Sequence, residues 1–456
     1  MHTHFLASLV LFLTFTLGFP QIANAHSSLK EIALDAVSEN TGERASALAA
    51  LRLAGPAGLD ALFEAHADEI NHHLSPPSHP DSQPETHDWR RLADALDKVS
   101  RQRDSYASRL YWYTDLESAK AAAAASGKPI LSLRLLGNLD EEFSCANSRF
   151  FRTTLYANAD ISKFLRERFV LHWKSVRPVP RVTIDYGDGR KLERTLTGNS
   201  IHYVLDARGR PVDALPGLYG PAAFLRSLKQ IEGVARESTR LSGPQRGGLL
   251  RGYHAGRLRE TNSAYQADAA RVGGMMPLRT VTPARVSGDP PTAVQAAPLA
   301  ITKMGVEMRT VRALTYVAGG LPAATDAAAW DRIAALHLAD ARLDQSSINL
   351  IRRHHHYTHQ PASASRTKTL LTETALSRIV RNLERSIALD TVRNEYVLRA
   401  TIHSWFVSGA EGADVEGLNE RVYAELFLTP SSDLWLGLVS PDTYTGLRSD
   451  GVVEKE

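Results

Sequence analysis

The chain of 456 residues contains a single cysteine, Cys145, which stands in the sequence Cys145-Ala146-Asn147-Ser148. An apolar run that predicts a strand precedes it, and a run that predicts a helix follows it. A strand, two cysteines separated by two residues, and a helix together form one class of redox site. Here serine stands at the second position, so this site cannot close a disulfide of its own. The fold around the cysteine is therefore constrained, and its chemistry is limited to that of a lone thiol.

Composition indicates a folded protein of more than one domain. The chain has the length of two or three average domains. Hydrophobic residues make up 43% of it, which is enough for real cores, and charged residues make up an ordinary 23%. The formal net charge of +3 is small for this size. It gives no reason to expect nucleic-acid binding, and we expect no nucleic-acid partner.

The N-terminus has the pattern of an export signal. Residues 5–17 are apolar apart from one serine and two threonines, and Gly18 and Pro20 then break the run. The small-residue sequence Ala23-Asn24-Ala25 that follows predicts a cleaved signal peptide of residues 1–25. The run is too short for a membrane-spanning helix, and no other run reaches about 18 apolar residues. We therefore expect a periplasmic or secreted protein whose mature chain has no membrane span.

The first few residues depart from the usual signal-peptide pattern. They include His2 and His4 but no lysine or arginine, which signal peptides normally carry ahead of the apolar run. An uncleaved anchor and a misplaced start are the two alternatives to a cleaved signal.

Residues 26–105 predict a helical segment. Apolar residues recur at helical spacing over 29–36, 45–53 and 59–67, and Gly55-Pro56 breaks the chain between the second and third of these runs. The two short helices in ERASALAALRLAGPAGLDALFE resemble one HEAT-like unit. One such unit cannot bury its apolar face alone. We therefore expect this segment to dock on a neighbouring part of the chain.

Residues 106–235 alternate between helix and strand patterns. An alanine-rich helix is predicted over 116–126, and a strand over 130–136 leads toward the cysteine. The other predicted elements are helices at 150–156 and 161–169, strands at 169–173, 182–186, 192–196 and 201–205, and a closing helix at 221–231. This order describes a mixed α/β domain.

Four stretches of this region resemble a known family. They are the helix and strand in SAKAAAAASGKPILSL, the site CANSR, the run YANADISKFL before FVLHW, and SIHYVLDARGRPV before the last helix. Together they resemble the thioredoxin-like domains of bacterial envelope proteins, over about a quarter of the chain. The resemblance places Cys145 at the family's nucleophilic cysteine and Ser148 at its second cysteine. It places Ser200 where the family carries a cis-proline.

Both departures from the family pattern change the chemistry that the resemblance implies. In the dithiol family the second thiol releases the product, and Ser148 is a poor substitute because its hydroxyl is not ionised near neutral pH. A non-proline cis bond costs about 2.5–4 kcal/mol, so we expect a trans peptide bond before Ser200 and an altered substrate groove. A helix start and Arg149 favour the thiolate of Cys145, whereas the acidic insertion at 137–144 opposes it.

Two hypotheses follow for the lone thiol. In the first, Cys145 performs monothiol thiol–disulfide exchange or redox sensing, with Ser148, Arg149 and Ser200 beside it and a protein thiol or disulfide as its partner. In the second, Cys145 is a small buried hydrophobe, and the domain is a non-catalytic protein-interaction module. A lone cysteine in an oxidising compartment is compatible with both hypotheses. Neither implies a cofactor or a metal ion.

Histidines form two further groups. His172 and His202 lie in predicted strands of the same region, where strand ends can bring them toward the site, although alternation along a strand more often makes such residues part of the core. His355 and His359 have the i, i+4 spacing of a metal-binding pair. No third ligand is identifiable, and Arg352-Arg353 repels a cation, so we favour a solvated basic loop.

The remaining chain divides into a linker and a helical region. Residues 236–300 are rich in Arg, Gly, Pro and Ala and predict a linker with one helix from about Gly256 to Val272. Its arginines lack interleaved aromatic residues, which indicates a solvated face. Residues 301–456 predict a C-terminal helical domain. The expected fold class is multi-domain α/β plus α, a thioredoxin-like central domain flanked by helical segments.

Overall fold

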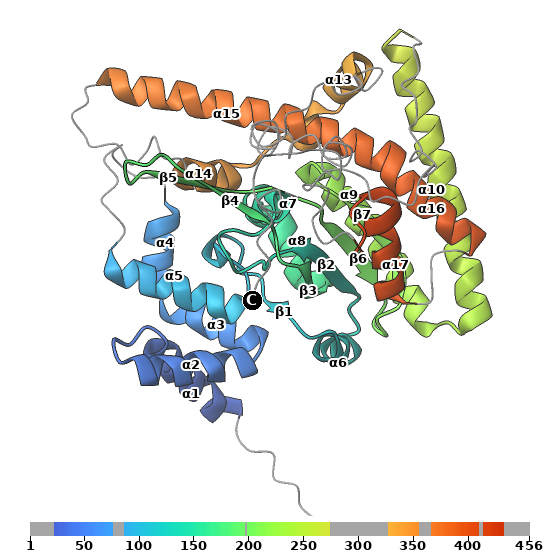
Figure 1. The fold of residues 1–456 in the computed structure, drawn as a ribbon. Coiled ribbons are helices and arrows are strands. Elements are labelled where there is room, and N and C mark those ends of the chain that lie inside the picture. Colours follow the sequence, from blue (N-terminus) through green and yellow to red (C-terminus); the bar gives the residue numbers. More distant parts are fainter. Residues whose placement is uncertain are drawn as a thin grey trace, which may run out of the picture.

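The chain folds into a mixed α/β structure in which helices predominate (Figure 1). The computed structural model describes residues 22–75, 86–196, 198–273, 327–354, 366–409 and 414–432. The mixed α/β class expected from the sequence is thus confirmed. Most of the predicted signal segment, the linker after residue 273 and the histidines at 355–359 lie outside the described residues. None of the described helices is both long enough and apolar enough to span a membrane.

The N-terminal unit consists of helices. They are α1 (Ile22–Asp35), α2 (Thr41–Leu53), α3 (Pro56–Ala65), α4 (Ala67–Leu74), α5 (His87–Ser100) and the 3-10 turn η1 (Ser105–Ala107). The Asn40 side chain caps α2 by accepting from the N–H groups of Gly42 and Glu43. Pro56 stands in the first turn of α3, where a missing N–H costs no hydrogen bond. The helices pack around a small core that includes Leu51, and their assignment as a HEAT-like unit stays a prediction.

The central sheet has five strands in the order β1-β3-β2-β6-β7 (Figure 1). They are β1 (Trp112–Tyr113), β2 (Ile130–Leu136), β3 (Val170–Arg177), β6 (Ile201–Leu205) and β7 (Pro211–Pro216). The pairs β1–β3 and β3–β2 are parallel, whereas β2–β6 and β6–β7 are antiparallel. The sequence pattern did not predict β1, which has two residues, or β7, where Pro211, Pro216 and Asp213 obscure the strand pattern.

One contact ties the N-terminal unit to this sheet. Arg52 of α2 donates to the backbone carbonyl of Trp112 in β1 (2.6 Å) and to that of Val99 at the end of α5 (2.9 Å). The Tyr111 hydroxyl in turn donates to the carbonyl of Arg52 (2.9 Å). The helical segment therefore docks on the edge of the sheet at β1, as we expected of a unit that cannot bury its apolar face alone.

Helices cover both faces of the sheet. Those nearest to it in sequence are α6 (Leu116–Ser126), α7 (Ala146–Phe150), the π-helical turn η2 (Phe151–Tyr156), α8 (Ala159–Arg168) and α9 (Pro221–Arg240). Adjacent residues of a strand point to opposite faces. In β6, His202 contacts Tyr156 and packs against Phe224 of α9, whereas the Tyr203 hydroxyl donates to Asn419 in the C-terminal region. The two faces are therefore closed by different parts of the chain.

Helix α10 (Gly243–Arg271) is longer than the sequence predicted, because it begins at Gly243 rather than near Gly256. Its glycine-rich start has low helix propensity, but tertiary contacts compensate. Arg246 donates to the carbonyl of Pro211 in β7 and lies 3.5 Å from the Asp206 carboxylate. Much of the segment expected to be a linker is thus a helix packed on the sheet.

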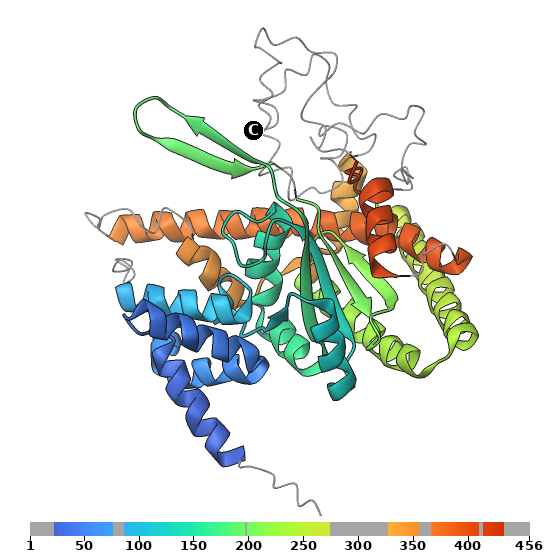
Figure 2. The same ribbon diagram turned by 60° about the horizontal axis from the view of Figure 1, so that its bottom comes forward.

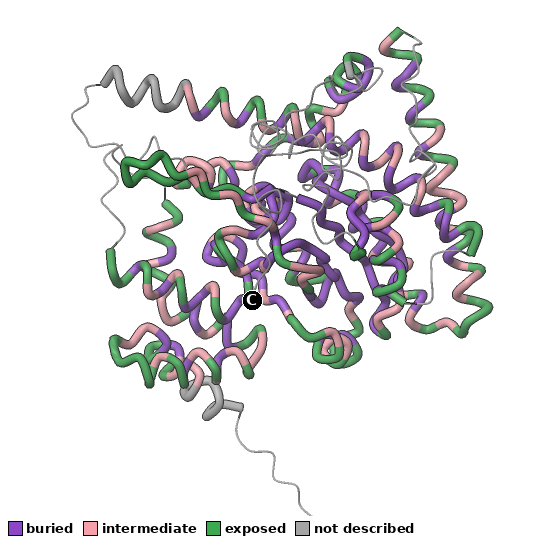
Figure 3. The backbone as a smooth tube through the Cα atoms, viewed as in Figure 1, coloured by how far each residue is buried: buried purple, intermediate pink, exposed green. Residues whose placement is uncertain are grey.

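The C-terminal region is helical, as predicted. It comprises α13 (Ala327–Leu336), the 3-10 turn η4 (Leu338–Ala341), α14 (Gln345–His354), α15 (Arg366–Arg393), the π-helical turn η6 (Asn394–Arg399), α16 (Ala400–Ser408), α17 (Val415–Arg421) and the π-helical turn η7 (Val422–Leu426). Leu215 of the sheet, Phe406 of α16 and Tyr423 of η7 belong to one contiguous buried cluster. Figure 3 shows this core at the centre of the molecule. No break in packing separates the sheet from the C-terminal helices.

A two-stranded hairpin extends from this body (Figure 2). It is formed by β4 (Arg181–Asp185) and β5 (Lys191–Thr195), close to the strands predicted at 182–186 and 192–196. β4 alternates between exposed and half-buried residues, and β5 is exposed or half-buried up to its last residue, Thr195, which is buried, so most of the hairpin is not covered as the central sheet is.

Replacing Gly58 by alanine is expected to lower the free energy of unfolding. A Cβ atom at this position in α3 would overlap the backbone carbonyl group of Leu51 in α2. The two helices would have to separate, at a cost of about 1–3 kcal/mol. Denaturant unfolding followed by circular dichroism measures the difference.

The matched control is Gly233→Ala, in the exposed middle of α9. No atom lies within 4 Å of a Cβ built there, so the substitution is expected to stabilise the helix by about 0.5–1 kcal/mol. Equal stability of Gly58→Ala and wild type would contradict the close packing of α2 on α3.

Candidate functional site

Cys145 lies at the start of α7, just after the end of β2. Its backbone N–H donates to the carbonyl of Leu136 (3.1 Å), which closes the base of the insertion 137–144. The residue is completely buried, with 0% relative exposure. The strand–cysteine–helix arrangement predicted from the sequence is therefore present, but the thiol does not reach the surface.

The structure brings three of the four predicted site residues together. The thiol sulfur of Cys145 lies 3.4 Å from the Ser148 hydroxyl, to which it donates, and 3.0 Å from the Ser200 hydroxyl. Ser148 Oγ also donates to the carbonyl of Cys145 (2.8 Å). The described residues contain no cis peptide bond, so Ser200 follows a trans bond as expected. Both substituted positions thus surround the sulfur with hydroxyl groups.

Two buried tyrosines, Tyr156 and Tyr423, also lie near the sulfur of Cys145. Burial is the larger cause that raises the pKa of Tyr156 and of Tyr423 well above the usual value, and the proximity of Cys145 raises both further. The Tyr156 hydroxyl lies 2.7 Å from Nε2 of His202, and the Tyr423 hydroxyl donates to the carbonyl of Asn199 (2.9 Å). Both phenols therefore stay neutral and keep their protons at any physiological pH.

The C-terminal region forms the cover over Cys145. Tyr423 belongs to η7, and Thr429 just beyond it accepts a hydrogen bond from the Asn199 amide (3.0 Å). The carbonyl of Thr429 accepts a further bond from Arg177 of β3 (2.8 Å). These contacts join the residue before Ser200 to a segment more than 220 positions away in the chain. No local sequence pattern could have indicated them.

The charges expected beside the thiol are engaged with other partners. The three carboxylates of the insertion pair with arginines: Asp140 with Arg101 (3.3 Å), Glu142 with Arg103 (2.6 Å) and Glu141 with Arg181 (3.8 Å). The guanidinium of Arg149 donates to the Thr195 hydroxyl at the end of β5 (2.8 Å). The three carboxylates are therefore held in ion pairs with arginines, and Arg149 is held by a neutral hydroxyl group.

The two strand histidines are core residues. Burial lowers the pKa of His202 to about 3. Burial, helped by the nearby Arg134 charge, also lowers the pKa of His172 to about 3. Nδ1 of His172 lies 2.8 Å from the Ser132 hydroxyl. Each ring is neutral near pH 7 and hydrogen-bonded within the protein.

Two other predictions concern basic residues. His355 and His359 lie outside the described residues, and the adjacent His354 pairs with Asp104 (3.3 Å). The arginines expected on a solvated face are in part engaged. Arg246 contacts Asp206, and Arg257 lies 3.1 Å from the Glu395 carboxylate in η6. For these two arginines the solvated-face prediction is wrong.

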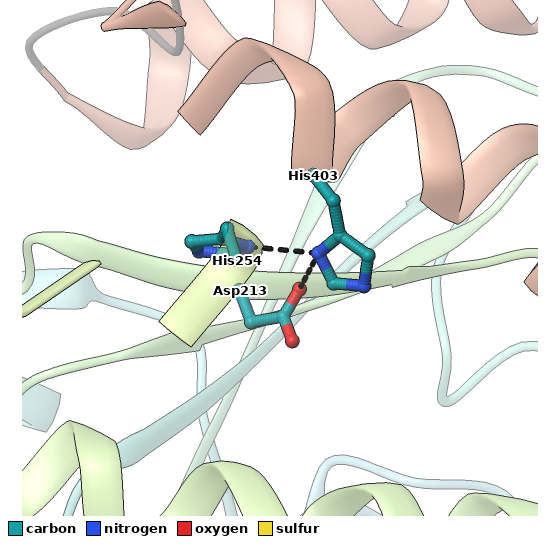
Figure 4. A group of neighbouring side chains, drawn as sticks. All are labelled: Asp213, His254 and His403. Atoms are coloured by element: carbon teal, nitrogen blue, oxygen red, sulfur yellow. Dashed lines mark hydrogen bonds and ion pairs between the residues drawn. The ribbon is translucent and has the colours of Figure 1, made fainter. Parts of the chain in front are cut away.

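A second cluster, which the sequence did not indicate, lies between β7, α10 and α16 (Figure 4). It consists of Asp213, His254 and His403, all fully buried, with one ligand-type atom from each lying within 4.8 Å of the others. Nδ1 of His254 lies 2.7 Å from Nδ1 of His403, and this atom of His403 lies 3.8 Å from Oδ1 of Asp213. We call these three residues the Asp-His-His cluster.

Arg399 of η6 holds the carboxylate of this cluster. Its guanidinium donates to Asp213 (2.7 Å) and, on the other side, to Glu395 (2.9 Å). Tyr253 donates to the same oxygen of Asp213 (2.8 Å). Glu395 lines a cavity of about 260 Å³ between α9, α10 and η6, so this network extends from the sheet to a cavity.

The charge states of the cluster follow from its surroundings. Burial raises the pKa of Asp213, but the Arg399 charge, the two neighbouring imidazoles and the hydrogen bond from Arg399 together outweigh burial and hold this pKa well below its usual range. Burial lowers the pKa of His254, and it lowers that of His403 further still. Asp213 is therefore ionised and both imidazoles are neutral, so each of the three side chains has a lone pair to offer.

Comparisons with known proteins give no family for this chain. No family model, no curated protein and no solved structure matches it. The two clusters are therefore interpreted from their geometry alone.

Replacing His202 by glutamine is expected to reduce the pH dependence of stability. The folded pKa of His202, about 3, lies below the unfolded value of about 6.5, so protonation favours the unfolded chain. The stabilising contribution is complete above about pH 6.5 and is lost as the pH falls toward 3. Between about pH 7.5 and 5 the wild type loses about 2 kcal/mol through this residue.

Denaturant unfolding at both pH values measures this loss, which His202→Gln should abolish. The control is His87→Gln on the exposed first turn of α5, which should behave as the wild type does. An unchanged pH dependence in His202→Gln would show that His202 is not a buried neutral ring.

Proposed function

We propose that this chain is an extracytoplasmic protein whose central α/β unit is thioredoxin-like in fold and acts as a non-catalytic protein-interaction module. The observation that carries the proposal is the complete burial of Cys145 under the C-terminal segment. Thiol–disulfide exchange requires a thiolate to reach a sulfur atom of the partner in line. A sulfur enclosed by Ser148, Ser200 and the cover at Tyr423 meets no partner while the fold is closed.

The strand arrangement supports the fold part of the proposal. Three parallel strands, β1, β3 and β2, are followed by the antiparallel pair β6 and β7, and the cysteine lies between the end of β2 and the first turn of α7. A strand before the cysteine and a helix after it, in a sheet of mixed direction, support the thioredoxin-like fold that the sequence resemblance implies. The serines aligned with the family's second cysteine and its cis-proline both contact the sulfur, as the alignment implied.

The hairpin β4–β5 supports the interaction part of the proposal. It projects from the body with both strands accessible (Figure 2). Val182 and Ile184 are half-buried side chains on β4, and Tyr186 at the turn is 55% exposed. A projecting hairpin with apolar and aromatic side chains offers contact area that the body does not need for its own core.

The location outside the cytoplasm rests on the predicted signal peptide. Cleavage after Ala25 would shorten α1, which begins at Ile22, to residues 26–35. The N-terminal unit would keep Ala33 and Ala36, which belong to its buried core. Export is thus compatible with the packing of the N-terminal helices.

The second candidate function is monothiol exchange or redox sensing through Cys145, with a protein thiol or disulfide as partner. The contact of Ser200 favours it, because its hydroxyl lies 3.0 Å from the sulfur and either atom can be the donor, whereas Ser148 donates to the carbonyl of Cys145. This activity would require the cover at η7 to lift. With no second thiol to release the product, the protein would stall as a mixed disulfide.

The reaction of Cys145 with iodoacetamide separates the two functions. In the native wild type we expect alkylation at least about a hundredfold slower than in the denatured chain, because the reagent must wait for a local opening. Tyr423→Ala removes part of the cover and should raise the native rate at least about tenfold. Mass spectrometry of the intact protein over time gives both rates.

Tyr186→Ala is the matched control. It removes an exposed tyrosine at the turn of the hairpin rather than one in the cover over Cys145, so the native rate should stay unchanged. A native rate equal to the denatured rate, together with a Cys145-dependent mixed disulfide in the host envelope, would favour the redox function and overturn the proposal.

A further inference from the structure

We infer that the Asp-His-His cluster is a binding site for one divalent transition-metal ion of the zinc class, held by Nδ1 of His254, Nδ1 of His403 and Oδ1 of Asp213. Two imidazoles and one carboxylate are a common set of protein ligands for such an ion. The inference is independent of the function proposed for Cys145, because it uses none of the residues around that thiol.

The hydrogen-bond contacts of the cluster leave a position between its three ligand atoms that a cation can occupy. Nε2 of His254 lies 2.9 Å from the carbonyl oxygen of Val212, which only accepts, so in the neutral ring Nε2 carries the hydrogen and Nδ1 carries a lone pair. Nδ1 of His403 points at that lone pair and at the carboxylate oxygen Oδ1 of Asp213. Three acceptor-type atoms thus converge on one point (Figure 4). Either a single proton on His403 or a cation must fill it.

The surroundings orient two of the three ligands, His254 and Asp213, as they do around bound metals, whereas Nε2 of His403 has no hydrogen-bond partner among the described residues. A metal-binding histidine usually donates its other N–H to a backbone carbonyl or a carboxylate, which is the contact that His254 makes with Val212. The second oxygen of Asp213 is held by Arg399 and Tyr253, and the N–H of Ala214 donates to the first (2.7 Å). These two ligands therefore need little reorientation to bind.

The spacing of the cluster is near that of a metal shell. Bonds of about 2.0–2.1 Å place two tetrahedral ligand atoms about 3.4 Å apart. The two Nδ1 atoms at 2.7 Å would have to separate by about 0.7 Å, while the 3.8 Å between His403 and Asp213 would shrink slightly. The histidines stand on separate helices, α10 and α16, so a small shift of one helix along the other supplies this change.

The charge beside the site is compensated. Arg399 would repel a cation if its charge were unopposed, but it is shared between Asp213 and Glu395. Arg257 in turn binds Glu395 (3.1 Å). Arg257 also pairs with Glu260 (2.6 Å), so the two guanidiniums and the carboxylates of Glu395 and Glu260 sum to zero, and the charge of Asp213 is left to the ion.

Zinc binding by the full-length wild type tests the inference. The chain is first stripped with a chelator, then loaded with Zn²⁺ alone, desalted and analysed by elemental mass spectrometry. We expect one zinc per chain. His254→Gln and His403→Gln keep a polar side chain at each position but remove the imidazole, and each should weaken zinc affinity at least about tenfold in a competition with a chromogenic chelator.

The matched control is His202→Gln, which removes a buried histidine from the same sheet without touching the cluster and should keep full zinc binding. A second control, His355→Gln with His359→Gln, removes the i, i+4 histidine pair noted in the sequence. Zinc lost in that control and kept in His403→Gln would overturn the inference.

X-ray absorption on the zinc-loaded wild type keeps the inference falsifiable if a histidine variant fails to fold. Two imidazole ligands with oxygen ligands and no sulfur are expected. A sulfur ligand, which only Cys145 and the methionines could supply, or no zinc retained in the wild type after loading, would overturn it.

Discussion

Arg399 is a fully buried cation, and the packing of the C-terminal helices on the sheet depends on the carboxylates that neutralise its charge. Asp213 from strand β7 of the sheet and Glu395 from the same π-helical turn neutralise it. Removing one partner of such a pair leaves an unpaired buried charge, at a cost of about 3–5 kcal/mol. Because Arg399 belongs to the C-terminal helices and Asp213 to the last strand of the sheet, neither part is electrostatically complete alone. The sheet and these helices share one contiguous buried core.

This shared core has a direct consequence for Cys145. The same C-terminal region that brings Arg399 to β7 continues through α17 to η7, where Tyr423 meets Asn199 beside Ser200. A thiol at the end of β2 would otherwise face a partner protein, but here the chain supplies its own cover. Burial of the sulfur thus follows from the packing that stabilises the sheet. The hairpin β4–β5 supplies no residue to this core.

Local sequence patterns predicted the setting of Cys145 but not its cover. The strand at 130–136 and the helix after the cysteine follow from short-range patterns. The family resemblance suggested Ser148 and Ser200 as site residues, and the structure places both serines beside the sulfur. Tyr423 and the Asp-His-His cluster gave no such signal. His254 and His403 are 149 positions apart on different helices, and Asp213 lies in a strand that the flanking prolines obscured. Contacts of that range come from tertiary packing, which a spacing motif does not encode.

Hydrogen exchange of the native full chain, followed by mass spectrometry, tests the single core most directly. If the Arg399–Asp213 pair joins the two parts, the slowest amides of β6 and β7 and those of α10 and α16 should open with the same free energy. Arg399→Met should then lower the protection of both sets together. Rapid exchange of α16 while β6 and β7 stay protected would show that the C-terminal helices are a separate domain, and would contradict the account.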